Sequence, residues 1–231
     1  MTKQQQPRPK PRNKTLEKPF TQELTSEIFR RFAAIEPEPK GELEHVNAFT
    51  LLVAVVLSAQ ATDAGVNKAT RELFKRADTA HKMAALGEDA VREHIKTVGL
   101  YRTKAKNGMA LSKLLIAEHG GEVPGDRAGL EALPGVGRKT ANVVLNMVFG
   151  HSTLAVDTHV FRVAHRIGLS RGATPEAVET DLMALVAPEY GRHAHHWLIL
   201  HGRYLCKARK PECWRCPVAD LCRFDDKVAG P

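Results

Sequence analysis

The chain has 231 residues, of which 43% are hydrophobic and 26% charged, a balance typical of globular rather than disordered or fibrous proteins. A chain of this length can bury a stable core without disulfide bonds. The uncharged stretch at residues 46–62 is interrupted by polar side chains, whereas a membrane span needs about 20 predominantly apolar residues. No apolar segment follows the N-terminus as it does in a secretory signal. We therefore expect neither a membrane protein nor a secreted one.

The positive charge of the chain is unevenly distributed. Lysine and arginine number 34 against 26 aspartate and glutamate, which gives a net charge of +8. Residues 1–19 contribute +5 of this charge and are rich in proline and glutamine, so we expect a disordered basic tail there. The tail is either a tether to DNA or only a solubilising extension. The remaining residues carry +3, which permits DNA binding without demonstrating it.

The hydrophobic pattern from residue 21 onward has the period of α-helices, and no alternating strand pattern of useful length occurs. Leu24, Ile28 and Phe32 recur every four residues, ahead of prolines at 37 and 39 that end a helix. Further helices are expected at residues 49–59, 63–76, 88–96, 102–119, 126–132, 138–149, 158–168, 174–187 and 190–204. The sequence therefore predicts an all-α fold of roughly ten helices.

Several residues mark the ends of these predicted helices. Asp126, Asp157 and Thr174 each stand directly before a periodic run and are of the types that cap helix N-termini. Glycines mark two turns, because residues 98–105 (VGLYRTKA) echo residues 134–141 (PGVGRKTA). Both segments place glycine in a tight turn between two helices, an arrangement that would suit two corners facing the same partner.

The turn at residues 133–141 (LPGVGRKTA) has features that suit a phosphate group. Gly135 and Gly137 can adopt positive φ and carry no side chain that would block the approach of another backbone. The next helix begins near Arg138 and leaves unpaired N–H groups at the positive end of its dipole. Such a turn either binds a phosphate or is an ordinary helix–helix corner. On glycine spacing alone, both interpretations stay open.

This turn resembles the helix–hairpin–helix signature of the endonuclease III family of DNA base-excision glycosylases. Residues 57–63 (LSAQATD) and 156–162 (VDTHVFR) resemble two further segments of that family, in matching order and spacing. The similarity extends over about residues 25–227, nearly everything except the tail. The resemblance implies base-excision DNA repair by a bifunctional enzyme, a DNA N-glycosylase for oxidised pyrimidines that is also an AP lyase.

The resemblance also implies two helical lobes that flank a DNA-binding groove. One lobe is a helical barrel at residues 41–151 and contains the helix–hairpin–helix motif at 126–149. The other lobe is discontinuous, combines residues 20–40 with 152–231, and holds a C-terminal cluster loop. The implied partner is double-stranded DNA that contains damaged pyrimidines or abasic sites. We expect a monomer in the cytoplasm, beside the chromosome and without membrane contact.

Lys139 and Asp157 are the catalytic pair that the resemblance implies. Lys139 would attack C1′ of the deoxyribose, expel the damaged base and form a Schiff base, after which β-elimination cuts the strand. Asp157 would assist deprotonation and stabilise the positive charge of an oxocarbenium-like state. A nucleophilic lysine must be neutral, and we expect a helix N-terminus and a dry pocket to favour that form. By themselves the two residues also fit a solvated helix lysine and an N-cap.

Two residues are candidates for holding the duplex open, since a lesion inside a duplex must be extruded before it can react. Gln60 lies in a segment that resembles the family and is the candidate that faces the orphan base. Leu100 stands at the tip of the 98–101 turn and is the candidate apolar wedge between bases. The alternatives are a polar helix end for Gln60 and a hydrophobic staple for Leu100.

Four cysteines, Cys206, Cys213, Cys216 and Cys222, lie within 17 residues of one another. Four thiolates can hold either zinc or an iron–sulfur cluster. Zinc ribbons usually pair two CxxC motifs, whereas this chain has one. The spacing C-x6-C-x2-C-x5-C resembles that of the endonuclease III family, which implies a [4Fe–4S] cluster with a structural role.

Other residues near the hairpin and the cysteines are expected to contact DNA. They are Gly135, Gly137, Arg138, Arg203, Lys207, Arg209 and Lys210. The histidines between 193 and 201 could suggest a second metal, but their helical spacing does not converge on one ligand set, so packing or surface roles are expected. Met183 is expected in the core, and Trp214 is expected to pack within the cysteine loop.

Two alternative functions remain. Adenine-mismatch glycosylases are similar enzymes, but they lack a lysine at the position that Lys139 occupies here. A noncatalytic DNA-binding module held together by a metal cluster would explain the hairpin and the cysteines, but it would not need Lys139 and Asp157. Strand scission of an abasic duplex distinguishes this module from a lyase.

Overall fold

The computed structural model describes residues 20–230, and the predicted disordered tail at residues 1–19 lies outside them. Within this range the chain is helical and has no β-strand, so the all-α prediction is confirmed. The helices are α1 (Gln22–Ile35), α2 (Ala48–Ser58), α3 (Asp63–Arg76), α4 (Ala80–Leu86), α5 (Glu88–His94), α6 (Tyr101–His119), α7 (Arg127–Glu131), α8 (Arg138–Phe149), α9 (Thr158–Ile167), α10 (Pro175–Leu185), α11 (Pro188–Gly191), α12 (Ala194–Tyr204) and the 3₁₀ turn η1 (Cys213–Arg215). None of the helices in this range is both long and apolar enough to cross a membrane.

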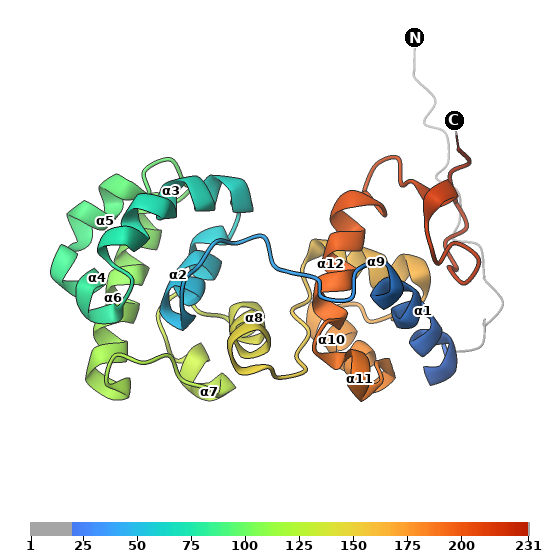
Figure 1. The fold of residues 1–231 in the computed structure, drawn as a ribbon, viewed down its shortest axis with the longest axis horizontal. Coiled ribbons are helices and arrows are strands. Elements are labelled where there is room, and N and C mark those ends of the chain that lie inside the picture. The colour runs from blue at the N-terminus through green and yellow to red at the C-terminus, as the bar shows by residue number, and fades with distance from the viewer. Residues whose placement is uncertain (1–19, 231) are drawn as a thin grey trace, which may run out of the picture.

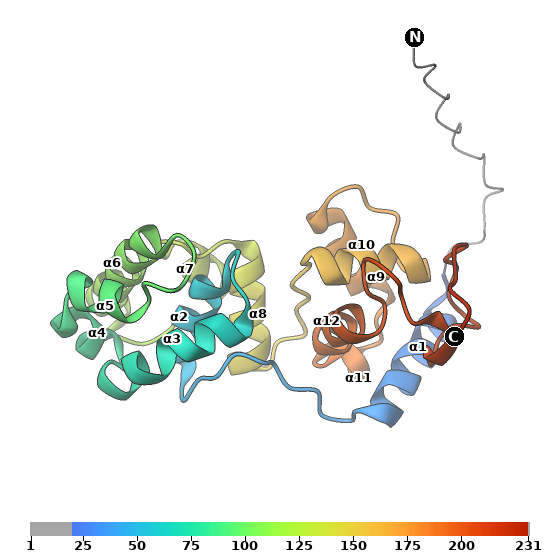
Figure 2. The ribbon, with the colours of Figure 1, turned by 90° about the horizontal axis from the view of Figure 1, so that it is seen from above.

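The helices form two lobes, which Figure 1 shows side by side. The first lobe contains α2 to α8, and the second contains α1, α9 to α12 and the C-terminal loop. Two non-helical segments, residues 36–47 and 150–157, connect the lobes. The chain thus begins in the second lobe, crosses to the first and returns, and Figure 2 shows the same division from above.

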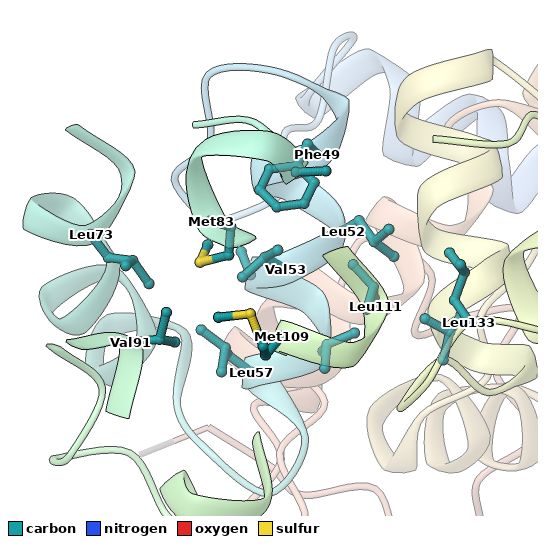
Figure 3. Packing of buried hydrophobic residues seen from close by; sticks show 14 of the residues in the cluster. Phe49, Leu52, Val53, Leu57, Leu73, Met83, Val91, Met109, Leu111 and Leu133 are labelled. Carbon is teal, nitrogen blue, oxygen red and sulfur yellow. The ribbon is translucent and has the colours of Figure 1, made fainter. Parts of the chain in front are cut away.

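The first lobe is built around α2, in which all residues from Phe49 to Leu57 are buried. In Figure 3, Val53 lies beside Met83 of α4, and Leu57 lies beside Met109 of α6. Most of the uncharged stretch at residues 46–62, which polar side chains interrupt, therefore forms the central helix of this lobe. Its apolar residues face neighbours on all sides, as expected for a fully buried helix.

The second lobe has a separate core between α1, α9, α10 and α12. The ring of Phe29 in α1 lies 6.0 Å from that of Trp197 in α12, and the Trp197 indole donates a hydrogen bond of 2.8 Å to the Glu36 carbonyl. Among the described residues, no buried apolar side chain belongs to both cores. Apolar burial therefore stabilises each lobe on its own.

The buried face of α1 differs slightly from the expected one. It consists of Thr25, Ile28, Phe29 and Phe32. Leu24 was expected on this face, but it is 38% exposed. The buried residues follow the i, i+3, i+4, i+7 spacing of a helix face, and Leu24, one residue before the first of them, lies at its edge.

Three details of the helix pattern were not anticipated. Met183 was expected in the core but is 45% exposed, because Leu182 faces the core and successive helix residues point about 100° apart. The sequence analysis also missed α4, which is only seven residues long, and α11, which is only four. Such short helices do not repeat the apolar spacing often enough to be recognised.

The three predicted N-caps are confirmed. Asp126 accepts a hydrogen bond of 2.9 Å from the Gly129 amide, and Thr174 accepts one of 3.2 Å from the Ala177 amide. Asp157 begins α9 in the same way. These caps satisfy N–H groups that each helix start leaves unpaired.

Candidate active site and DNA-binding surface

The hairpin between α7 and α8 is held by two buried apolar residues, Leu133 and Val136. Gly135 has φ +81°, and a Cβ at this position would come within 3.0 Å of the Asn107 amide nitrogen, so glycine is needed here. Gly137 caps α8 without a side-chain hydrogen bond and faces open space. The first N–H groups of α8 have no side-chain acceptor at this cap and suit an incoming anion.

Lys139 lies in the first turn of α8 and is exposed. It lines a cavity of about 80 Å³ between the lobes, together with Asp63 of α3 and with His195 and Arg203 of α12. The expected dry pocket is therefore not formed in the free protein. The amine is open to solvent because it stands where the two lobes face each other, which also leaves it accessible to a DNA sugar.

Asp157 stands at the N-terminus of α9, close enough to Lys139 for the charge of the amine to act on its carboxylate. One carboxylate oxygen accepts hydrogen bonds from the amides of His159 and Val160, at 2.9 and 2.8 Å, and the other lies 2.9 Å from His159 Nδ1. Burial disfavours the charged carboxylate, but these bonds and the charges of His159 and Lys139 outweigh it, so the pKa of Asp157 lies below its ordinary value. The site therefore contains an ionised carboxylate that interacts with the lysine.

His195 is a site residue that the sequence analysis did not identify. It is 4% exposed, lines the same cavity as Lys139, and its Nδ1 atom has no hydrogen-bond partner. Burial, aided by the neighbouring His196, lowers the pKa of His195 to about 3, although Asp157 opposes the shift. A neutral imidazole therefore faces the cavity. The sequence analysis considered the histidines between 193 and 201 as a second metal site and expected packing or surface roles, so it did not connect His195 with Lys139.

Two buried asparagines of α8 hold the segment that leads to Asp157. Asn142 donates a hydrogen bond of 3.0 Å to the Leu154 carbonyl, and the Thr153 hydroxyl donates one of 2.6 Å to the Asn142 carbonyl. Asn146 donates to the carbonyls of His151 and Arg192, each at 3.0 Å. The helix that carries the lysine thus also fixes the path of the chain to the carboxylate.

Gln60 and Leu100 lie on neighbouring loops. A Cβ on Gly99 would stand 3.8 Å from the Gln60 carbonyl, and the Lys104 amine donates a hydrogen bond of 2.7 Å to the Ala59 carbonyl. Leu100 is 63% exposed, an unusual position for leucine. The structure therefore brings these two candidates together.

Backbone strain marks the same candidates. Among the described residues, Gln60, Leu100 and Lys210 are the residues other than glycine that have positive φ, at 55°, 57° and 51°. Such conformations cost about 1–3 kcal/mol and tend to occur where function requires them. All three residues were predicted DNA contacts. No pattern in the sequence indicates that they share a strained backbone.

Two arginines that were expected to contact DNA form ion pairs with carboxylates. Arg138 forms a bidentate pair with Glu179, at 2.8 and 2.9 Å. Arg203 pairs with Asp63 at 2.5 Å and also with Glu42. Both guanidinium groups are thus paired in the free protein, and their contact with DNA stays a prediction.

The loop between Cys206 and Cys213 is fastened to α9. Arg166 donates hydrogen bonds to the carbonyls of Lys207 and Ala208, at 2.6 and 3.1 Å. The Lys207 amine is paired with Glu212, whereas Arg209 and Lys210 are exposed. Trp214, which was expected to pack in this loop, is 48% exposed, although Gly230 lies against it. Arg209 and Lys210 are thus the cations of the loop that project into solvent.

The four cysteines line one cavity and are half-buried free thiols. Cys216 Sγ lies 3.7 Å from His201 Nε2, and Cys222 Sγ lies 3.3 Å from the Arg166 carbonyl. Burial raises the pKa of Cys216 to about 11, so an occupant of the cavity must be a strong Lewis acid to hold it as thiolate. Four thiols that line one cavity can serve as the ligands of a metal centre. The set fits a cluster with one thiolate on each iron.

Two family models match the chain. Residues 53–188 match the model described as HhH-GPD superfamily base excision DNA repair protein, and residues 206–222 match the iron–sulfur binding domain of endonuclease III. The first match includes both Lys139 and Asp157, and the second begins and ends at a cysteine of the set. Hairpin, catalytic pair and cysteine loop therefore fall within regions that the two models describe.

Individual relatives agree with the models. The chain is 56% identical over 202 residues to endonuclease III of Rickettsia felis, covering 87% of this chain and 95% of that protein, and 53% identical over 202 residues to endonuclease III of Escherichia coli K12. A solved structure of a trapped endonuclease III–DNA covalent intermediate matches with a TM-score of 0.82 and 45% identity, covering 88% of this chain and 96% of that one. The chain belongs to the endonuclease III family of base-excision DNA repair proteins, whose [4Fe–4S] cluster its four cysteines fit.

Proposed function

We propose that Lys139 is the nucleophile and Asp157 the assisting carboxylate in this chain, a DNA glycosylase and AP lyase that removes oxidised pyrimidines. The observation that supports the assignment is the electrostatic interaction between the two groups, each of which stands at the start of a helix. Lys139 is an accessible amine at the start of α8, and its charge acts on the ionised Asp157 at the start of α9. An amine and a carboxylate on facing helix ends suit imine chemistry on an extruded sugar.

In the first step, the uncharged amine of Lys139 forms a bond to C1′ while the bond from C1′ to the base breaks. The base leaves with the bonding electron pair and takes up a proton, and Asp157 stabilises the positive charge that develops on the sugar. Opening of the sugar ring gives a protonated Schiff base. Loss of a proton from C2′ and departure of the 3′ phosphate then cut the strand, and water releases the lysine.

Bound DNA would complete the site that is open in the free protein. Covering the cavity removes water from around Lys139, which favours the uncharged amine that the attack requires. Gln60 would face the orphan base, and Leu100 would enter the stack beside it. The positive-φ backbone of their loops would fix the positions of both residues before DNA binds.

The remaining contacts would follow the backbone of the duplex. The amides at Gly135 and Gly137 suit a phosphate at the hairpin, and Arg209 and Lys210 suit phosphates at the cysteine loop. When the cluster is bound, Cys206, Cys213, Cys216 and Cys222 hold it, and it cross-links the C-terminal segment. The hydrogen bonds from Arg166 then fix the loop against α9.

We further propose a domain boundary that follows the two cores, with residues 41–151 in one unit and residues 20–40 plus 152–231 in the other. One monomer carries every residue that the proposed reaction needs. The bacterial relatives and the DNA substrate support a location beside the chromosome, in the cytoplasm.

Cleavage of a duplex with a single abasic site tests the assignment. Wild-type protein is expected to cut the strand, and Lys139→Gln is expected to lose at least about 10³-fold of the rate, since no other group supplies the imine. Lys113→Gln, which removes an exposed lysine of α6, is the matched control and is expected to match wild type. A Lys139→Gln variant that cuts at the wild-type rate would contradict the proposal, and wild-type protein without scission would favour a noncatalytic DNA-binding module.

A further inference from the structure

The polar contacts between the two lobes have no part in the catalytic steps described above. The lobes do not share a hydrophobic core among the described residues. Lys139 belongs to the first lobe and Asp157 follows the segment that enters the second. The distance between the two reacting groups therefore depends on how the lobes are held against each other.

One ion-pair junction joins α7 and α8 of the first lobe to α10 of the second. Glu179 of α10 forms the bidentate pair with Arg138, and Arg127 of α7 approaches the same carboxylate at 3.4 Å. The Glu179 side chain is only 9% exposed, whereas those of Arg138 and Arg127 are 47% and 34% exposed. A buried carboxylate with two arginines from the opposite lobe is a fixed contact rather than a mobile surface pair.

A second junction stands in the wall of the cavity that Lys139 lines. Arg203 of α12 reaches Asp63, the first residue of α3, and Glu42 in the first connecting segment. Its side chain is 24% exposed, and that of Asp63 is 16% exposed. This junction joins the second lobe to the first through a different pair of helices, so it resists rotation about the first junction.

The first junction is linked to Lys139 through the chain and to Asp157 through the packing of two helices. Arg138 directly precedes Lys139 in the first turn of α8. Helix α10 packs against α9 in the core of the second lobe, and α9 begins with Asp157 as its cap. A shift at Glu179 is therefore transmitted through rigid helices to both ends of the catalytic pair.

We propose that Glu179, through Arg138 and Arg127, is a positioning residue that sets Lys139 opposite Asp157. The inference rests on the proposed roles of those two residues. Arg203, with Asp63 and Glu42, supports the same alignment from the other junction. Glu179 does not touch the substrate, because a carboxylate facing DNA would be repelled by phosphates, and its oxygens already accept bonds from arginine.

If Arg138 instead binds a phosphate of DNA, removal of the Glu179 charge should have a different effect on the rate. If Arg138 served DNA, removing the Glu179 charge would release the arginine, tighten DNA binding and leave the reaction rate intact. If Glu179 positions the lobes, its removal lowers the rate at saturating DNA and does not weaken binding. The rate and the affinity of one variant therefore separate the two interpretations.

The test uses holoprotein with its cluster and a duplex with one abasic site. Glu179→Gln is expected to lower the single-turnover scission rate at saturating enzyme by about 10-fold to 100-fold, since a misplacement of about 1 Å can cost 10²-fold. The Kd for an uncleavable abasic analogue is expected to stay within about twofold of wild type or to fall. Glu179→Asp keeps the charge and is expected to recover part of the rate.

The matched control is Glu44→Gln, which breaks a bidentate pair with Arg71 on the first-lobe side of the molecule and is expected to leave the rate unchanged. Thermal unfolding and the visible absorbance of the cluster verify that each variant is folded. If Glu179→Gln does not fold, Arg138→Gln replaces it, because that side chain is half-exposed and Arg127 remains as a partner of the Glu179 carboxylate. A folded variant with the wild-type rate would overturn the positioning role, whereas failure of wild type to cut would overturn the proposed function instead.

Discussion

At the scale of single residues, Asp157 has two tasks that depend on different properties of its side chain. Capping α9 needs only an oxygen acceptor, and Asp157 provides it to the amides of His159 and Val160. Stabilising a cationic sugar needs a negative charge. The sequence predicted both roles for this residue, one from its place before a helix and the other from a family resemblance, and the two roles are compatible.

Asp157→Asn separates the two tasks. Asparagine is as good an N-cap as aspartate, so the free energy of unfolding at pH 7 is expected to change by no more than about 1 kcal/mol. Loss of the charge is expected to slow base release by about 10²–10³-fold, the size of effect seen when one group that stabilises a transition-state charge is removed. Urea unfolding and single-turnover glycosylase assays measure the two effects. A variant that loses stability and rate together would show that Asp157 acts only through folding.

Buried histidines give the protein an acid-sensitive stability. His196 is 7% exposed, and burial, with the charge of His193, lowers its pKa to about 4. The ordinary value of about 6.5 applies in the unfolded chain. Between these values the unfolded state binds the proton and the folded state does not, so the free energy of unfolding falls as the pH is lowered from about 6.5 towards 4.

His196→Gln is expected to remove part of this dependence on pH. Glutamine has no titrating group, so the slope of unfolding free energy against pH between about 6.5 and 4.5 should become shallower than in wild type. Urea unfolding at a series of pH values measures both slopes. His45→Gln, which removes an exposed histidine, is the control and should keep the wild-type slope. Equal slopes in wild type and His196→Gln would contradict the account.

At the scale of elements, α8 combines the most functions in one segment. Its N-terminus forms the hairpin and presents Lys139, and its interior asparagines hold the segment before Asp157. The sequence predicted the bounds of this helix correctly, because glycines mark both of its ends. It could not predict the asparagine contacts, since a buried polar side chain in a helix shows no periodicity that identifies its partner.

Gly137→Ala tests the hairpin as a phosphate site. The position has φ −104°, and an added Cβ would meet nothing within 4 Å, so the free energy of unfolding should fall by no more than about 1 kcal/mol. The methyl group would stand where a phosphate approaches the α8 amides, and DNA affinity is expected to fall by about tenfold, roughly one charge-assisted hydrogen bond. Fluorescence anisotropy with an abasic-analogue duplex measures the affinity. Unchanged affinity would make the hairpin an ordinary helix corner.

At the scale of the whole molecule, the active site exists only where the two lobes meet. Figure 1 shows that the chain leaves the second lobe and returns to it, so residues distant in sequence face each other. Glu179 is 41 residues from Arg138, and Asp63 is 140 residues from Arg203. No local pattern connects such pairs, so the sequence could not predict that both arginines pair with carboxylates of the other lobe or of the connecting segment.

The parts of the site that the sequence did predict all have local signals. Glycines mark the hairpin, spacing marks the cysteine set and a helix start marks Asp157, whereas their functional roles were predicted from the family resemblance. The sequence could not predict which of these side chains are exposed. Lys139 is exposed and His195 is buried because of how α8 and α12 border the cavity. Chemistry was thus readable from residue types, whereas its surroundings required the fold.

Reductive trapping tests the central claim most directly. Borohydride added during reaction with a lesion duplex should reduce the Schiff base to a stable protein–DNA adduct, and peptide mapping by mass spectrometry should place it on Lys139, one adduct per chain. Lys139→Gln should give none. An adduct that maps to another amine of wild-type protein, or trapping of Lys139→Gln at the wild-type level, would contradict the account.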